Sequence, residues 1–124
     1  MRLALYAAAL LTLLVGLAHS YLGERYILTR LFRRDDLPRL FGRAEFTRRT
    51  LRFAWHLTTI SWWGFAAILV VLADPPATSS ALGAILGCTF LAHAAVTIVA
   101  SRGRHLAWPV FLAIGVIAIA ATRG

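Results

Sequence analysis

Long apolar runs are the feature that most constrains how this chain can fold. Four runs, each interrupted by few polar residues, extend over positions 3–22, 51–73, 81–100 and about 106–121. A helix of about 20 apolar residues crosses the roughly 30 Å hydrocarbon core of a bilayer. Charged residues make up only 15% of the sequence, whereas soluble domains carry about 25%. We therefore predict an all-α integral membrane protein, a single membrane domain over residues 1–124 that forms a four-helix transmembrane bundle.

The breaks between the runs define the expected helices. They are predicted over about 3–22, 47–73, 80–101 and 106–122. Asp74-Pro75-Pro76 ends the second helix because proline cannot continue it, and a hydroxyl at Thr78, Ser79 or Ser80 can cap the third. Short connections make neighbouring helices antiparallel, so the expected order is up-down-up-down.

One connection is long and strongly basic. Over about 23–46, apolar side chains recur at helical spacing and arginines oppose them, which predicts an amphipathic segment lying in the headgroup plane. The alternative is a helical extension of the first helix beyond the membrane. The residues expected to contact lipid headgroups are Arg30, Arg33, Arg34 and Arg39.

Charge placement predicts the orientation. The net charge is +8, all thirteen basic residues are arginines, and nine of them lie between Arg25 and Arg52. Arg102 and Arg104 follow the third helix. Because basic connections stay in the cytoplasm, we expect the 23–52 interval inside, both termini outside, and a bacterial inner-membrane location. Arginines gathered between membrane spans indicate membrane lipid as a partner and argue against nucleic acid.

No catalytic motif of a soluble enzyme is present. The sequence lacks the phosphate-binding loop, the dinucleotide fingerprint, the zinc-protease helix and the nucleophile elbow. Cys88 is the only cysteine, so no intramolecular disulfide can form. These absences argue against an enzyme.

The residues with the most chemical potential are four histidines, one associated with each predicted helix: His19, His56, His93 and His105. In the predicted orientation all four fall in the cytoplasmic half of the bilayer. Their helical neighbours are small or polar, as in the Thr89, His93 and Thr97 series. Polar residues of membrane helices tend to face the bundle interior, so the imidazoles are expected in one layer.

Three interpretations of this layer compete. The histidines are structural, each bonded to a hydroxyl, carbonyl or headgroup. Alternatively they bind haem b or one transition metal, with His56 and His93 as the best-placed axial pair, His19 next as a metal ligand, and His105 at the interface. The third interpretation is a proton path, against which the lack of an intramembrane carboxylate counts.

The function expected from these features is that of a small non-catalytic membrane protein, an accessory or assembly subunit of a larger complex. The alternatives are a haem- or metal-binding electron-transfer or sensor protein, and a proton or small-solute channel. Gly83 and Gly87 form a small-xxx-small pair that brings helices close. Packing within the chain is favoured for this pair over a homodimer.

Overall fold

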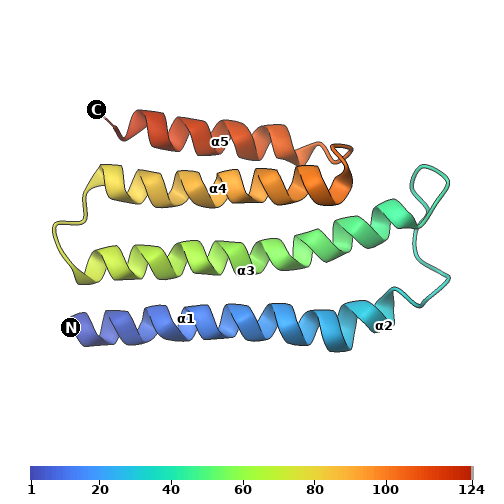
Figure 1. Cartoon of the computed structure of the whole chain (residues 1–124), viewed down its shortest axis with the longest axis horizontal. Helices are drawn as coiled ribbons and strands as arrows, with labels where there is room; N and C mark the ends of the chain where they lie inside the picture. Colours follow the sequence, from blue (N-terminus) through green and yellow to red (C-terminus); the bar gives the residue numbers. More distant parts are fainter. Residues whose placement is uncertain (124) are drawn as a thin grey trace.

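The computed structural model describes residues 1–123, and that part of the chain is helical with no strand (Figure 1). Its elements are α1 (Arg2–Leu22), the π-helix η1 (Gly23–Leu28), α2 (Thr29–Leu31), α3 (Glu45–Ala73), α4 (Ser79–Ser101) and α5 (Ala107–Ala121). The first three elements form one continuous helix. The predicted all-α class is therefore confirmed.

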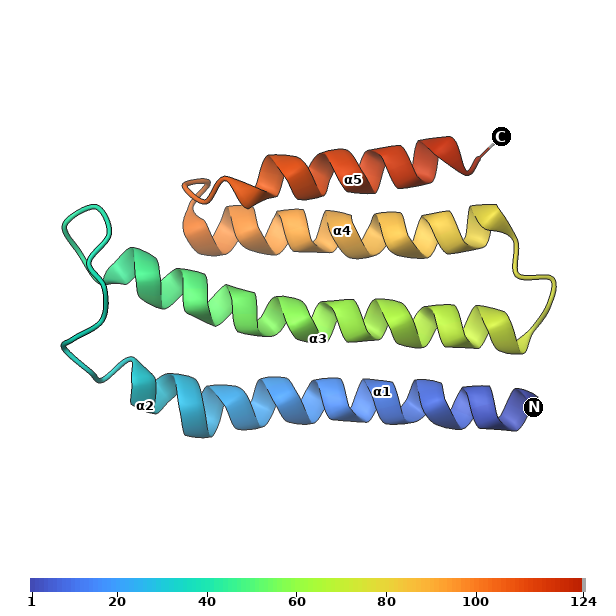
Figure 2. The ribbon, with the colours of Figure 1, turned by 180° about the vertical axis from the view of Figure 1, so that it is seen from behind.

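The helices lie side by side in chain order, in a single row seen from both sides (Figures 1 and 2). Among residues 1–123, close backbone contacts join α1 with α3, α3 with α4, and α4 with α5, and none joins α1 with α4 or α5. A bundle closed around one axis would give each helix two neighbours. The row differs from that expectation because the closest contacts, made at glycines, link consecutive helices only.

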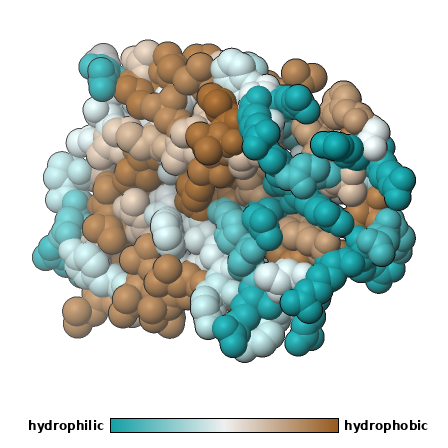
Figure 3. Space-filling model, turned by 45° about the vertical axis from the view of Figure 1, so that its right-hand side comes forward, coloured by the Kyte–Doolittle hydropathy of each residue, from teal (hydrophilic) through white to brown (hydrophobic). Residues whose placement is uncertain are grey.

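Three helices are long and apolar enough to cross a membrane: Arg2–Leu31, Glu45–Ala73 and Ser79–Ser101. The fourth, α5, is apolar but has 15 residues, which extend about 22 Å. Hydrophilic side chains gather where the helices meet the long connection and the α4–α5 turn, which we call the polar end of the row (Figure 3). The distribution is that of an integral membrane protein with one strongly polar end.

The first helix continues well past the end of its apolar run. The segment 23–31 extends α1 through η1 and α2, so it takes the alternative form, a helical extension, for these residues. The amide of Gly23 bonds to the carbonyls of His19 and Ser20, and the His19 carbonyl also accepts the Trp55 indole N–H at 3.0 Å. This crowding of donors on one carbonyl coincides with the start of the π-helix. The rest of the connection, 32–44, contains turns.

Glycines allow α1 to approach the tryptophans of α3. A Cβ on Gly16 would lie 2.8 Å from Trp63 Nε1, and one on Gly23 would overlap the Trp55 ring. The Trp63 indole donates to the Leu13 carbonyl at 3.4 Å. The two tryptophans thus pack against the first helix and hydrogen-bond its backbone. This contact explains why Trp63 lies deep within α3, away from the interface where tryptophans usually anchor a membrane helix.

At the ends of the helices opposite the long connection, one acidic side chain joins the α3–α4 turn to α1. Asp74, in the α3–α4 turn, accepts hydrogen bonds from Arg2 and Tyr6 of α1. The Thr78 hydroxyl accepts from the Ala81 amide at 3.1 Å and caps α4. These bonds fix the turn relative to α1.

The closest helix pair is α4 with α5. Gly83 and Gly87 of α4 both face α5, where Thr122 and Gly115 lie opposite. A Cβ on Gly87 would stand 2.8 Å from the Gly115 carbonyl oxygen, a backbone atom that cannot turn away. The small-xxx-small pair is therefore placed in a contact within the chain.

We expect Gly87→Leu to force α4 and α5 apart and to lower stability by about 1–3 kcal/mol, the usual cost of overpacking. Ala84→Leu is the matched control because Ala84 is exposed on the same helix. Thermal unfolding in detergent, followed by tryptophan fluorescence, measures both. Equal midpoints for the two variants would contradict the packing described for Gly87.

Candidate functional site

The four predicted site histidines have separate neighbours. His19 lies against Trp55 and Trp62, while His105 lies against Phe46 and Phe53. The other two bond to polar groups, His56 between α1 and α3 and His93 between α3 and α4. No hydrogen bond or ring contact joins two of the imidazoles within residues 1–123. Nor does that part of the chain contain a group of three or more His, Cys, Asp or Glu side chains able to hold a metal ion.

His56 is the centre of a polar cluster between α1 and α3. Its Nδ1 lies 2.8 Å from Ser20 Oγ, and its Nε2 lies 3.3 Å from Glu24 Oε2. The other oxygen of Glu24 pairs with Arg52 Nη2 at 3.0 Å. Ser20 and Glu24 are four residues apart on one helix, as are Arg52 and His56 on the other, so each pair shares a helix face. The two faces meet and form one connected network.

The network continues toward the membrane interior through hydroxyls. Ser20 Oγ lies 2.7 Å from Thr59 Oγ1, and Thr59 donates to the Gly16 carbonyl at 3.1 Å. A hydroxyl has one proton, so Thr59 must accept from Ser20, and Ser20 must then accept from His56. The proton of His56 is thereby assigned to Nδ1.

The Glu24 carboxyl thereby contacts two side chains of the facing helix. One of its oxygens lies against His56 Nε2, and the other pairs with Arg52.

His93 is bonded differently. Its Nδ1 donates to the Thr89 carbonyl at 2.6 Å, its Nε2 lies 2.9 Å from Ser61 Oγ, and Phe90 and Phe111 flank the ring. The His93 side chain is buried. The Ser61 hydroxyl also donates to the Leu57 carbonyl of its own helix at 3.1 Å, so it joins His93 to the backbone of α3. Both ring nitrogens of His93 are then occupied.

The remaining two histidines contribute mainly ring contacts. His19 stacks on Trp55 with ring centroids 4.5 Å apart, and its buried Nε2 has no hydrogen-bond partner in the part of the chain that the structure describes. His105 lies in the α4–α5 turn, where its Nδ1 accepts the Ala107 amide at 3.3 Å. Its ring meets Phe53 edge-on. This contact ties the turn to α3.

Sequence reasoning missed Ser20, Glu24 and Ser61 as partners of the histidines. The predicted first helix ended at Leu22, which placed Glu24 in the connection, so no carboxylate was expected beside the histidines. The contact between Glu24 and His56 corrects this expectation. The sequence does contain a signal for this contact. Ser20 and Glu24 are four residues apart, as are Arg52 and His56, so each pair would share a helix face.

Comparison with known proteins adds no assignment. No family model, curated protein or solved structure matches this chain. The function is therefore inferred from the geometry of the chain itself.

A double-mutant cycle tests the network. Ser20→Ala and His56→Ala each remove an interhelical bond, and because they remove the same bond we expect a coupling energy of about 0.6–1.7 kcal/mol, the range for such bonds in membranes. The measurement is unfolding in mixed micelles. Ser20→Ala combined with Ser61→Ala is the control, and those two effects should add within about 0.5 kcal/mol. Strict additivity of the first pair would show that the Ser20–His56 bond does not contribute.

An absorption spectrum, oxidised and reduced, with elemental analysis tests the predicted haem or metal site. We expect no Soret band and no stoichiometric iron, copper or zinc, because both ring nitrogens of His56 and of His93 already have partners. A band or metal that is lost in His56→Ala or His93→Ala, and retained in His105→Ala, would contradict this expectation.

Proposed function

We propose that this chain is a small non-catalytic integral membrane protein that serves as an accessory or assembly subunit of a larger membrane complex. The observation that supports this proposal is the open row of helices. Within residues 1–123, the continuous helix formed by α1, η1 and α2 packs against α3 alone, and α5 packs against α4 alone. Both edges of the row are therefore open to helices of another protein.

The edge helices bury little of their own surface. The buried residues are Ala9 and Gly16 in α1 and Gly115 in α5. The larger apolar side chains of both helices face outward along much of their length. Since helix association in lipid depends on packing rather than on hydrophobic burial, such edges accept either lipid or a complementary helix.

The proposal includes a membrane crossing by α5. This helix runs alongside α4, from Trp108, whose indole donates to the Gly103 carbonyl at 3.2 Å, to Thr122, which lies opposite Gly83. Four crossings would bring both arginine-bearing connections to one side. By the distribution of positive charge this side is the cytoplasm, with both termini outside and the inner membrane of a bacterium as the location.

The channel interpretation has weaker support. His93 and Ser61 are joined by a hydrogen bond between α3 and α4, whereas Thr89, one turn deeper, donates to the Ile85 carbonyl of its own helix. From Trp62 to Ala73, α3 has no hydroxyl, imidazole or carboxylate group. In the outer half of α1, Thr12 donates to the carbonyl of Ala8 in its own helix. A proton path through this chain alone would stop halfway.

Besides the two edges, we propose a groove between α3 and α4, closed at one side by Phe111 of α5, as a surface for the partner. It has a volume of about 410 Å³, and its walls include Phe65 and Leu86, which are 55% and 40% exposed. Ser61 and His93 also line it. An apolar transmembrane helix with one polar side chain would complement this lining.

Affinity purification of the full chain in mild detergent, with quantitative mass spectrometry, tests the proposal. We expect a membrane protein to be recovered in constant ratio, and about tenfold less of it with Phe65→Ala plus Leu86→Ala, because removing two apolar side chains that the partner would cover costs more than about 1.4 kcal/mol. Val70→Ala plus Val99→Ala is the matched control, since both residues are exposed and lie outside the groove. A solitary protein, or equal loss with both pairs, would contradict it.

A further inference from the structure

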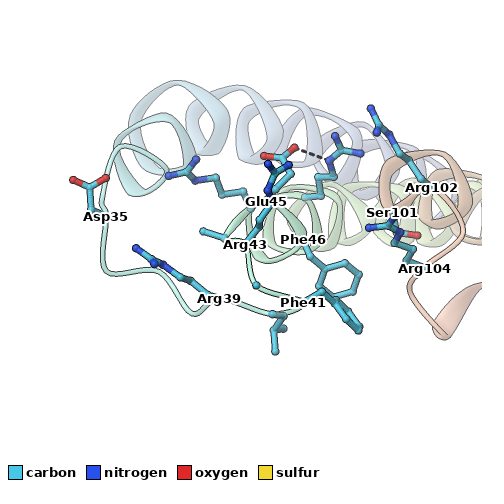
Figure 4. Close-up of a pocket in the computed structure, with 14 residues that line it drawn as sticks. Asp35, Arg39, Phe41, Arg43, Glu45, Phe46, Ser101, Arg102 and Arg104 are labelled. Carbon is cyan, nitrogen blue, oxygen red and sulfur yellow. Dashed lines mark hydrogen bonds and ion pairs between the residues drawn. The ribbon is translucent and has the colours of Figure 1, made fainter.

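The polar end of the row contains a cavity of about 770 Å³ (Figure 4). It lies between the long connection, the first turns of α3 and the α4–α5 turn. Its charged lining consists of six arginines and two acids: Arg39, Arg43, Arg48, Arg49, Arg102, Arg104, Asp35 and Glu45. The volume is in the range of sites that bind small molecules.

Most of this positive charge has no partner. Arg49 donates to Glu45 at 2.7 Å, and none of the other five arginines makes an ion pair within residues 1–123. The Nε atom of Arg48 is buried and has no hydrogen-bond partner among the described residues. Guanidinium groups are fork-shaped donors suited to phosphate and carboxylate oxygens. The cavity is therefore built to receive an anion.

Local structure holds the arginines on opposite walls. The Thr47 hydroxyl donates to the Pro38 carbonyl at 2.7 Å and fastens the connection to α3, which places Arg39 and Arg43 on one wall. On the other wall, Arg102 ends α4 in the left-handed conformation, with φ of 53°. The following Gly103 returns its amide to the Ile98 carbonyl at 2.8 Å. Two separate segments thus contribute arginines to the lining of one cavity.

Apolar side chains beside the cavity favour a lipid over a free ion as its ligand. Phe41 is 78% exposed and meets Phe46 edge-on, and Leu106 in the α4–α5 turn is 84% exposed. Exposed apolar groups beside arginines are typical of a surface that lies at the boundary of headgroups and acyl chains. A free phosphate would use only the arginines, whereas a phospholipid would also use the apolar rim.

We propose that this cavity binds the phosphate groups of an anionic phospholipid, and that it prefers a headgroup with two phosphodiesters, as in cardiolipin, over one with a single phosphate. The arginines on two walls can each take one phosphate, and basic pockets at the cytoplasmic ends of membrane helices favour such headgroups. The site differs from the headgroup contacts expected from the sequence. Of those residues only Arg39 lines the cavity.

The other arginines predicted to contact headgroups lie outside the cavity. Arg34 donates to both oxygens of Asp36, at 2.8 and 2.6 Å, and this bonding lowers the pKa of the Asp36 carboxyl. Asp36 stays ionised and neutralises Arg34. Arg30 lies over the Tyr26 ring, and Arg33 is exposed. Arg30 and Arg33 therefore provide a control with the same loss of charge at the same end of the molecule.

The test is lipid binding to the full chain in neutral detergent, measured by native mass spectrometry with cardiolipin, phosphatidylglycerol and phosphatidylcholine, and with inorganic phosphate as competitor. We expect the order cardiolipin, phosphatidylglycerol, phosphatidylcholine. Arg43→Gln with Arg104→Gln should weaken cardiolipin binding about 25-fold, from about fivefold for each arginine. Both residues are exposed, so the folded state should persist. Arg30→Gln with Arg33→Gln should change binding less than threefold, below the fivefold expected for one phosphate-binding arginine.

Three results would overturn the proposal. Equal losses for the two variant pairs would mean a diffuse basic surface rather than a cavity. Equal affinity for cardiolipin and phosphatidylglycerol would remove the preference for two phosphates. Displacement of cardiolipin by inorganic phosphate at matched phosphate concentration would identify a free anion as the ligand.

Discussion

Inside hydrocarbon there is no water to satisfy a polar group, and this constraint decides how the helices of the row are joined. The Ser20 hydroxyl on α1 has partners on α3 in His56 and Thr59, and the Ser61 hydroxyl on α3 has one on α4 in His93. Each bond joins consecutive helices. Glycines at the same interfaces permit the close approach that these short side chains require. A row results because neither kind of contact links α1 with the far helices.

The same constraint gives the two bonded histidines different chemistry. His93 is buried between phenylalanines, and its ring nitrogens bond to a hydroxyl and to a backbone carbonyl. His56 lies farther along toward the polar end, where Glu24 supplies a negative charge and Arg52 supplies a compensating positive one. The Glu24 carboxyl is satisfied there because each of its oxygens has a partner on α3. The difference follows from the depth of each residue and the reach of the extended first helix.

The sequence predicted the helices better than their relative rotation. Apolar runs identify three spanning helices, because the thickness of hydrocarbon demands that length. The end of the first helix was missed because an apolar run ends where the membrane ends, whereas helical hydrogen bonds continue through good helix formers such as Glu24 and Arg25. The environments of the four histidines depend on how each helix is turned about its axis. That rotation is set by packing, as with Trp55 against Gly23, which a hydropathy pattern does not contain.

The two ends of the row handle charge in opposite ways. At one end Arg2 and Asp74 neutralise each other and close the structure. At the other, arginines outnumber acids around an open cavity, and the apolar Phe41 stands beside them. Like charges repel, so holding five unpaired guanidinium groups around one space costs free energy unless an anion is present. In a bilayer the anions at that level are lipid phosphates, and their binding would offset the repulsion only when the chain is in a membrane that contains them.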